Sequence, residues 1–429
     1  MKATHTAASI AMRPRLLVVP HVYAEDICVR EIELARRLTD EFDVYCLSWR
    51  DALNMEGGPS LARRWKQFRR AVGSACAPRK SRPGPDGFTL IEAPVLQSVL
   101  LQRIAGRERA EAWARAFNRR TLEAICKEWN ITQLLLAATS FEFPRIAGLK
   151  KYLDVVDWFP EDLMTEEKSA AMRRVFMQNA AAADGVFAVS EPLCGKLKHD
   201  CGIQATPLPN GADLDALRAV PAQRVAVLRR RLGLENKYVI GYIGNHGSYT
   251  GVDFAVKVFE RVRMQIPNAA LLIVGPAEFW RALLEAKRDA GVVWTGPVPP
   301  AEVAAFFHAL DLGILAQEKS LGTELAFQIK IVEYTACRKL VVSTPLATWE
   351  RLAWPNIFLA RLEVDAWVSA IVRAYHSRWH LEWDGLVEPY DWRALTAKLA
   401  AAMLGENRRS EREAELALEA SVAEHSVGV

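Results

Sequence analysis

Lys330 and Glu333 are the side chains whose type and spacing say most about the chemistry of this chain. They lie in Gln328-Ile-Lys-Ile-Val-Glu-Tyr334, where an irregular loop turns into a helix ahead of a buried strand. A lysine at a helix start adds its charge to free N–H groups and to the positive end of the helix dipole, which suits a diphosphate. Glu333 lies one turn further on the same face, where its two oxygens can accept from a ribose diol. The pair predicts a nucleotide site; an ordinary surface ion pair is the alternative.

A glycine-rich loop supports the nucleotide interpretation. The apolar run 238–243 ends in Gly244-Asn-His-Gly-Ser-Tyr-Thr-Gly251, whose glycines let the backbone approach a charged group at the mouth of a parallel sheet. Gly244, Asn245 and Gly247 are the residues that would line a phosphate. The spacing matches neither G-x-G-x-x-G nor G-x-x-x-x-G-K-[ST], which disfavours a dinucleotide redox enzyme and a P-loop ATPase. A tight strand-to-helix turn is the other interpretation.

The length and composition of the chain limit the kinds of protein to which these residues can belong. The chain has 429 residues, more than the roughly 250–300 at which a single core stops growing, so two domains are expected. Hydrophobic residues make up 51% of it, but no apolar run approaches the ~20 residues of a membrane-spanning helix. The cysteines form no C-x-x-C pair, which argues against a disulfide framework or a zinc site. We predict a cytoplasmic protein with no metal and no cofactor.

Strand and helix patterns alternate along the whole chain. The apolar runs 15–20 and 42–48 flank a helical pattern at 29–38, a β-α-β unit that implies a parallel sheet covered by helices. Further strands are predicted at 132–137, 185–190, 238–244, 270–275, 292–295, 312–315 and 340–343. A turn-rich segment at 207–213 separates two such sets. The fold class is therefore α/β with two doubly wound domains.

The domain boundaries follow from these patterns. We predict a disordered leader over 1–13, an N-terminal acceptor-binding domain over 14–207, a nucleotide-sugar domain over 208–385, a C-terminal helix over 386–404 that packs back toward the first domain, and a flexible tail over 405–429. The functional labels of the two domains rest on a family resemblance.

The ordered set of motifs resembles the retaining GT-B glycosyltransferases of group 1, the family-4-like type. Lys330-Ile-Val-Glu-Tyr334 resembles the Lys-x-x-Glu-Tyr helix of that family's donor domain. Further segments resemble motifs of that family and occur in the same order along the chain: Ala183–Ser190, Pro209–Asp213, Gly244–Gly251, Thr295–Pro299 and Asp311–Leu315. The resemblance covers nearly all of 208–344 and, more loosely, 15–190. It implies two Rossmann-like domains facing across a cleft and metal-independent transfer of a sugar with retained configuration.

Carried onto this sequence, the resemblance implies roles for single residues. Lys330 contacts the donor diphosphate, Glu333 the ribose, and the backbone around Val298 the base, while Gly244 and Gly247 face the phosphates. The chain departs from the family at two positions. Leu325 stands where a glutamate is expected, with Glu324 one position away as a substitute, and Thr250 stands where a basic residue often occurs.

Two residues of the first half are candidates for catalysis beside Lys330. Asp157 follows a predicted strand at a place where the family often has a polar group beside the acceptor, and its carboxylate could take a proton or stabilise positive charge. His21 follows the first strand and could touch donor or acceptor. A turn aspartate and a structural histidine are the respective alternatives.

A basic segment near residue 65 interleaves cations with aromatic rings. Its members are Arg63, Arg64, Trp65, Lys66, Phe68, Arg69 and Arg70. Such a segment suits an anionic membrane surface or an acceptor, and a solvated segment is the alternative. It forms no recognised nucleic-acid module, so nucleic acid is not a predicted partner. The predicted location is cytoplasmic, with peripheral association at the inner face of a membrane.

The sequence thus predicts a glycosyltransferase that moves a sugar from a nucleotide-sugar to a glycan or lipid-linked acceptor. Two other functions remain open. A nucleotide-sugar epimerase of the same fold would keep the nucleotide site but needs paired acid and base groups near the sugar. A non-catalytic GT-B scaffold that binds a membrane or another partner would fit the leucine at 325.

Overall fold

The computed structural model describes residues 13–21, 30–51, 78–96, 106–137, 141–158, 166–377 and 385–405. The basic segment 63–70 and most of the predicted leader and tail lie outside these ranges. The chain divides into two compact units, one of residues 1–155, 165–187 and 396–429, and the other of residues 156–164 and 188–395. Within the described residues, none of the helices is long and apolar enough to cross a membrane.

The first unit is built on a sheet in the order β3-β4-β2-β1-β5-β6-β7-β8. Its strands are β1 (Arg15–Val19), β2 (Asp43–Asp51), β3 (Lys80–Pro83), β4 (Thr89–Val95), β5 (Gln133–Leu136), β6 (Lys150–Val155), β7 (Gly185–Ala188) and β8 (Thr206–Pro207). The central strand β1 pairs in parallel with β2 and β5, whereas β3 runs antiparallel to β4. Four of the five side chains of β1 are fully buried, as expected for a strand covered on both faces.

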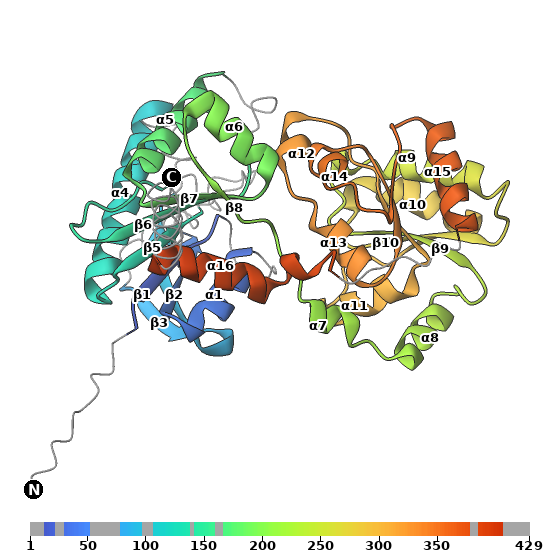
Figure 1. Ribbon diagram of the computed structural model, residues 1–429, viewed down its shortest axis with the longest axis horizontal. Helices are drawn as coiled ribbons and strands as arrows, with labels where there is room; N and C mark the ends of the chain where they lie inside the picture. Colours follow the sequence, from blue (N-terminus) through green and yellow to red (C-terminus); the bar gives the residue numbers. More distant parts are fainter. Residues whose placement is uncertain are drawn as a thin grey trace, which may run out of the picture. The chain divides into compact units, whose positions relative to one another are not determined.

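Helices connect these strands. They are α1 (Arg30–Arg37), α4 (Arg107–Glu128), α5 (Glu166–Ala182) and α6 (Glu191–Cys201), and the final helix α16 (Trp392–Leu404) joins this unit from Thr396 onward (Figure 1). The hydroxyl of Tyr152 on β6 donates to the carbonyl of Met403 at 2.8 Å, which fixes the end of α16 against the sheet of the first unit. The division between the units falls after Phe187, ahead of the turn-rich segment that predicted a boundary at 207.

The second unit holds a parallel sheet in the order β11-β10-β9-β12-β13-β14. Its strands are β9 (Tyr238–Ile243), β10 (Ala269–Val274), β11 (Val292–Trp294), β12 (Leu312–Leu315), β13 (Leu340–Ser343) and β14 (Ile357–Leu359). All six residues of β10 are buried. The predicted strands of this half are all present; β14, three half-buried residues long, was not predicted because so short a run carries no pattern.

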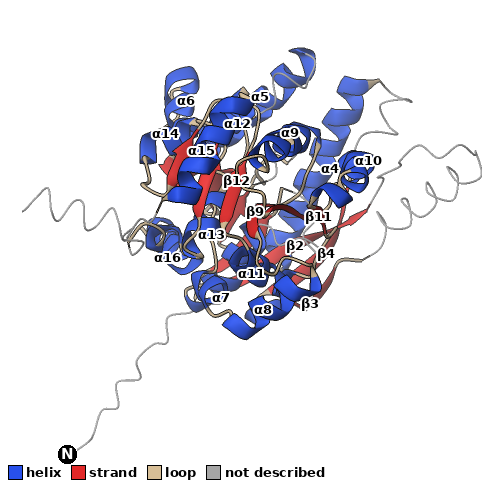
Figure 2. Ribbon diagram, turned by 90° about the vertical axis from the view of Figure 1, so that its right-hand side faces the viewer, coloured by secondary structure: helices blue, strands red, loops and turns tan. Residues whose placement is uncertain are grey.

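Helices cover both faces of this second sheet. They are α7 (Leu214–Arg218), α8 (Ala222–Arg231), α9 (Val252–Val262), α10 (Arg281–Ala286), α11 (Pro300–Ala309), α12 (Leu321–Leu325), α13 (Ile329–Ala336), α14 (Ala347–Leu352) and α15 (Val364–His376). In Figure 2, α9 and α15 lie together on one face and α11 and α13 on the other. This arrangement is that of a doubly wound domain.

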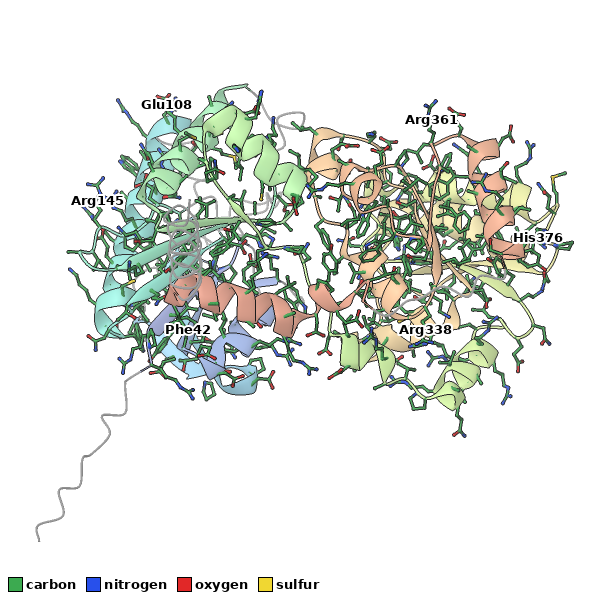
Figure 3. The ribbon with its side chains drawn as sticks, in the orientation of Figure 1. Phe42, Glu108, Arg145, Arg338, Arg361 and His376 are labelled. Atoms are coloured by element: carbon green, nitrogen blue, oxygen red, sulfur yellow. The ribbon has the colours of Figure 1, made fainter. Side chains whose placement is uncertain are left out.

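One aromatic side chain, Tyr334, packs helix α13 against the sheet. The ring of Tyr334, which is fully buried, lies where a side chain on Gly313 of β12 would be, since a Cβ there would meet the ring at 2.6 Å. The Tyr334 hydroxyl accepts from the backbone N–H of Ile243 at 3.1 Å and lies 3.3 Å from the carbonyl of Gly241. Burial raises the pKa of Tyr334, so the phenol keeps its proton. The helix ends before Arg338, which has a left-handed φ of 56° (Figure 3).

Tyr334→Phe should lower the free energy of unfolding by about 1–3 kcal/mol, because the buried N–H of Ile243 loses its partner while the ring packing remains. Urea denaturation followed by tryptophan fluorescence measures this change. Tyr375→Phe is the matched control, since Tyr375 is 40% exposed and should change stability little. Equal effects of the two substitutions would show that Tyr334 does not anchor α13 through its hydroxyl.

Candidate functional site

The strand order of the second sheet places a topological switch point at the carboxyl ends of β9 and β12. From β9 the chain winds outward to β10 and β11, and then it returns to the other side of β9 to form β12, β13 and β14. Loops from neighbouring strands diverge at such a topological switch point, and open α/β sheets bind ligands there. The glycine-rich loop follows β9, and α12 and α13 follow β12.

Glycines permit an unusually close approach of backbones at this switch point. A Cβ on Gly275, after β10, would lie 1.9 Å from the carbonyl oxygen of Gly244, after β9. A Cβ on Gly251 would lie 2.2 Å from the carbonyl oxygen of Ala316, after β12, and Gly251 also has a φ of 65°. Both positions therefore require glycine. The loop from Gly244 to Gly251 is held close to the ends of both neighbouring strands.

The structure brings the predicted lysine and glutamate together beside this loop. Lys330 Nζ donates to Glu333 Oε2 at 2.6 Å, and the two side chains are 29% and 18% exposed. A Cβ on Gly244 would lie 3.7 Å from Lys330 Cε, so the lysine stem runs alongside the first glycine of the loop. The ammonium also lies 5.6 Å from the ring centroid of Phe307. A cation, a carboxylate and a close backbone loop thus meet at the switch point.

His246 is a buried residue of the same loop to which the sequence analysis assigned no role. It is 2% exposed, its ring packs on Tyr242 with centroids 4.7 Å apart, and its Nε2 lies 3.1 Å from the carbonyl of Val274. The pKa of His246 is lowered to about 4, chiefly by burial and also by the charge of Lys330, against the opposing effect of hydrogen bonds to the backbones of Val274 and Tyr242. The ring is therefore neutral at pH 7 and fixes the loop without adding charge. A histidine in a loop gives no sequence signal for such burial.

Two indoles donate hydrogen bonds to the loops after β9 and β10. Trp280 Nε1 donates to the carbonyl of Gly247 at 3.0 Å, and Trp294 Nε1 donates to the carbonyl of Gly275 at 2.9 Å. The guanidinium of Arg281 lies over the Trp294 ring at 5.2 Å. Val298, the predicted base contact, is half-buried in the loop after β11. These contacts tie Gly247 to the segment after β10, and Gly275 to β11; the backbone N–H of Gly275 also donates to the carbonyl of Gly296 at 3.0 Å, in the loop that contains Val298.

Glu324 has structural partners of its own. Its Oε2 accepts from the backbone N–H of Ala347 at 3.2 Å, at the start of α14, and Lys319 Nζ lies 3.1 Å from its Oε1. Leu325 is buried, and its carbonyl accepts from the hydroxyl of Ser190 at 2.5 Å. The side chain predicted to replace the family glutamate thus caps a helix in this structure.

The remaining predicted residues lie at separate places. His21 follows β1 in the first unit, with Nδ1 2.5 Å from Glu31 Oε1, whereas Asp157 is exposed in the segment after β6 that groups with the second unit. Asn245 is exposed next to Gly244. In the described part of the chain, no cluster of three or more His, Cys, Asp or Glu side chains could hold a metal ion.

Solved structures of low sequence identity share this architecture over nearly the whole chain. Sucrose-phosphate synthase from Thermosynechococcus elongatus has a TM-score of 0.61 at 14% identity, over 94% of this chain and 100% of that one. WaaG, a glycosyltransferase involved in lipopolysaccharide biosynthesis, has a TM-score of 0.61 at 14% identity, over 91% and 100%. Anabaena HepE in complex with UDP and glucose has a TM-score of 0.59 at 14% identity, over 94% and 100%. The chain has the GT-B fold. Its two sheets are the two Rossmann-like domains that define it.

A family model matches part of the second of these GT-B domains. Residues 237–377 match the family described as glycosyl transferases group 1. TuaH of Bacillus subtilis, named for teichuronic acid biosynthesis, is 30% identical over 135 residues, which are 31% of this chain and 32% of TuaH. A GDP-mannose-dependent mannosyltransferase of Mycolicibacterium smegmatis is 28% identical over 142 residues, 32% and 37% of the two chains. The match spans about a third of each curated relative.

Gly251→Ala should destabilise the GT-B fold more than Gly233→Ala. Gly233 has a φ of 66° but no atom near its missing Cβ, so both substitutions share a backbone cost of about 1–2 kcal/mol. Gly251→Ala adds the overlap with the Ala316 carbonyl, which we expect to cost about 1–3 kcal/mol more. Thermal unfolding of both variants measures the difference. Equal losses would show that the close approach at the switch point is not a constraint.

His246 should make the stability of the protein depend on pH in weak acid. The unfolded chain takes up a proton near pH 6.5 and the folded chain near pH 4, so stability is complete above pH 6.5 and is lost as the pH falls toward 4. Its contribution to the slope is at most about 1.4 kcal/mol per pH unit. Urea denaturation between pH 4 and pH 7 should show a flatter profile for His246→Gln. An unchanged slope would contradict the neutral, buried imidazole.

Proposed function

We propose that this protein is a glycosyltransferase that moves a sugar from a nucleotide-sugar to a glycan or lipid-linked acceptor. The observation that carries the proposal is the position of Lys330: its stem lies against Gly244 at the switch point of the second sheet, and its ammonium is paired with Glu333. This is where an α/β domain of this type binds a ligand. The match of residues 237–377 to group 1 glycosyl transferases supports the same conclusion.

The donor would be held by groups with complementary chemistry. The ammonium of Lys330 would leave Glu333 for the diphosphate, and the freed carboxylate would accept from the ribose hydroxyls. The backbone of Gly244, Asn245 and Gly247 would line the phosphates and that of Val298 the base. Because the cation and the start of α13 can neutralise a leaving diphosphate, we propose transfer without a metal or cofactor. Retention of configuration is proposed from the family resemblance alone.

The acceptor is proposed to bind the first unit, with His21 as a candidate contact; Asp157, the other candidate, groups with the second unit. Both curated relatives support a glycan or lipid acceptor by name, one through teichuronic acid biosynthesis and the other as a phosphatidylinositol monomannoside mannosyltransferase. The complex of HepE with UDP-glucose supports a nucleotide-sugar as the donor. We place the activity in the cytoplasm, at the inner face of a membrane, with nucleic acid excluded as a partner.

One observation favours a second candidate, a non-catalytic GT-B scaffold. Leu325 is buried where the resemblance expects a glutamate, and Glu324 caps α14. A scaffold would bind a nucleotide-sugar without releasing nucleotide. An epimerase of the same fold would consume the donor without needing an acceptor. Donor turnover and its dependence on an acceptor therefore separate the three functions.

Lys330→Ala and Glu333→Ala should each abolish the response to the donor. The purified chain is screened with UDP-, GDP-, dTDP- and ADP-sugars for thermal stabilisation and slow nucleotide release. Removal of a charged hydrogen-bond partner of the donor should weaken donor binding by about tenfold or more. Lys257→Ala is the matched control, because Lys257 pairs with Asp253 on the exposed face of α9.

The screen has two other informative outcomes. Stabilisation without nucleotide release would favour the scaffold. No response of the wild-type chain to any of the four donors, or an equal loss in Lys257→Ala, would contradict the proposed donor site.

A further inference from the structure

Helix α4 of the first unit carries a line of basic and aromatic side chains along one side. Residues three or four positions apart lie one above the other on a helix, so a chain of such steps follows the helix axis. On α4 these steps connect Arg109, Trp113, Ala116, Phe117, Arg120, Ala124 and Lys127, here called the α4 stripe. At 1.5 Å per residue the stripe is about 27 Å long. None of its members is acidic.

The opposite side of α4 fixes the direction in which the stripe points. Asn118 Oδ1 accepts from the backbone N–H of Leu96 at 2.8 Å, and Asn118 Nδ2 donates to the carbonyl of Leu96 at 3.1 Å. These two bonds hold the helix beside the end of β4 (Figure 1). Also buried on this side are Ala110, Ala114, Leu122 and Ile125. The stripe therefore faces solvent: Trp113 is 54% exposed, and the three cations of the stripe are exposed.

The positive charge of the stripe is not neutralised by its neighbours. The acidic side chains that flank it pair with other arginines: Glu111 with Arg115, Glu123 with Arg119 and Glu128 with Arg79. Glu108, five residues before Trp113, lies more than a third of a turn away around the helix. By contrast, the side chains of Arg109, Arg120 and Lys127 make no ion pair with any residue that the structure describes. The stripe is thus complementary in charge to an anionic surface.

The composition of the stripe favours a lipid surface over a nucleic acid. An indole ring prefers the headgroup depth of a membrane, and the stems of arginine and lysine cover apolar surface while their charges reach lipid phosphates. A helix that reads a duplex presents polar side chains to the base edges. Between its cations, the α4 stripe presents Trp113, Phe117 and two alanines instead.

We propose that the α4 stripe docks the protein on an anionic membrane surface, with its three cations at the lipid phosphates and Trp113 at headgroup depth. The inference deepens the proposed function and rests on it in one respect: a transferase with a lipid-linked acceptor meets that acceptor at such a surface. The stripe is separate in sequence from the basic segment 63–70, which was predicted to contact a membrane.

The triple variant Arg109→Gln/Arg120→Gln/Lys127→Gln tests the charge of the stripe in the full-length chain, because glutamine keeps the helix propensity and removes the charge. Binding is measured by co-sedimentation with vesicles of phosphatidylcholine, with and without phosphatidylglycerol. The wild-type chain should bind the anionic vesicles, and more weakly as salt is added. Each cation should contribute about fivefold, so the triple variant should bind about 100-fold more weakly.

A second triple variant is the matched control. Arg230→Gln/Arg231→Gln/Lys257→Gln removes the same charge from exposed helices of the second unit, where these residues pair with Glu235, Glu302 and Asp253. It should weaken vesicle binding by less than about fivefold, because these charges lie outside the docking surface. Circular dichroism of both triple variants should match that of the wild-type chain.

Several outcomes would overturn the inference. They are equal losses in the two triple variants, unchanged binding of the stripe variant, no binding of the wild-type chain to anionic vesicles, and binding to a double-stranded oligonucleotide in preference to the vesicles. The assay contains no donor, so its failure is distinct from failure of the proposed function. The donor screen would in turn fail without affecting vesicle binding.

A fluorescence measurement tests the position of Trp113 directly. The chain has 13 tryptophans, so the contribution of Trp113 is obtained as the difference between the wild-type chain and Trp113→Phe. Anionic vesicles whose acyl chains carry bromine should quench the wild-type fluorescence, and Trp113→Phe should lose that quenching while it still binds the vesicles. Trp129→Phe is the matched control, because Trp129 ends α4 on the side away from the stripe and should leave the quenching unchanged. Equal quenching in the wild-type chain and Trp113→Phe would contradict the proposed docking.

Discussion

The close approach of backbones at the carboxyl ends of β9, β10 and β12 is the constraint on which the candidate site depends. Gly275 lets its strand end touch the carbonyl of Gly244, and Gly251 lets the loop touch the carbonyl of Ala316. Any side chain at either position would force the strand ends apart. Because the loop is held this close to the sheet, its first glycine lies beside Lys330. The glycines thus act through their missing Cβ atoms, which let the backbones come into contact.

A second contact of the same kind positions the charged residues. Tyr334 lies over Gly313, and its hydroxyl reaches the backbone of β9, so α13 is fastened to the two strands that flank the switch point. Lys330 and Glu333 are on this helix, so the contacts that fix the helix also fix their positions. His246 contributes packing and stays neutral, because burial lowers its pKa. The site therefore combines a placed cation with a loop that adds no charge of its own.

Both sheets extend from a first strand to one side and then continue on its other side, but they differ in chemistry at their switch points. The second has glycines, a lysine and a glutamate; the first has Arg30 paired with Asp154 and His21 paired with Glu31. Structural likeness extends over 94% of the chain, whereas the family match covers residues 237–377. The GT-B frame is thus common to both halves, and the family match falls within the second of them.

The sequence by itself determined the α/β class, the strands of both domains and the pairing of Lys330 with Glu333, because alternation of buried runs and helical patterns is a local property and an i,i+3 pair needs only one helix. It missed β3, β4, β8 and β14, which are short or interrupted by proline. It predicted a C-terminal helix over 386–404, whereas α16 begins at Trp392. Glu324 matched a family position, yet its partner is the backbone of Ala347, which the chain reaches only after β13. His246 is buried and contacts Val274, and Glu31 is buried and contacts His21. Both contacts join different elements of the fold. Such contacts depend on how strands and helices pack, so only the tertiary structure decided them.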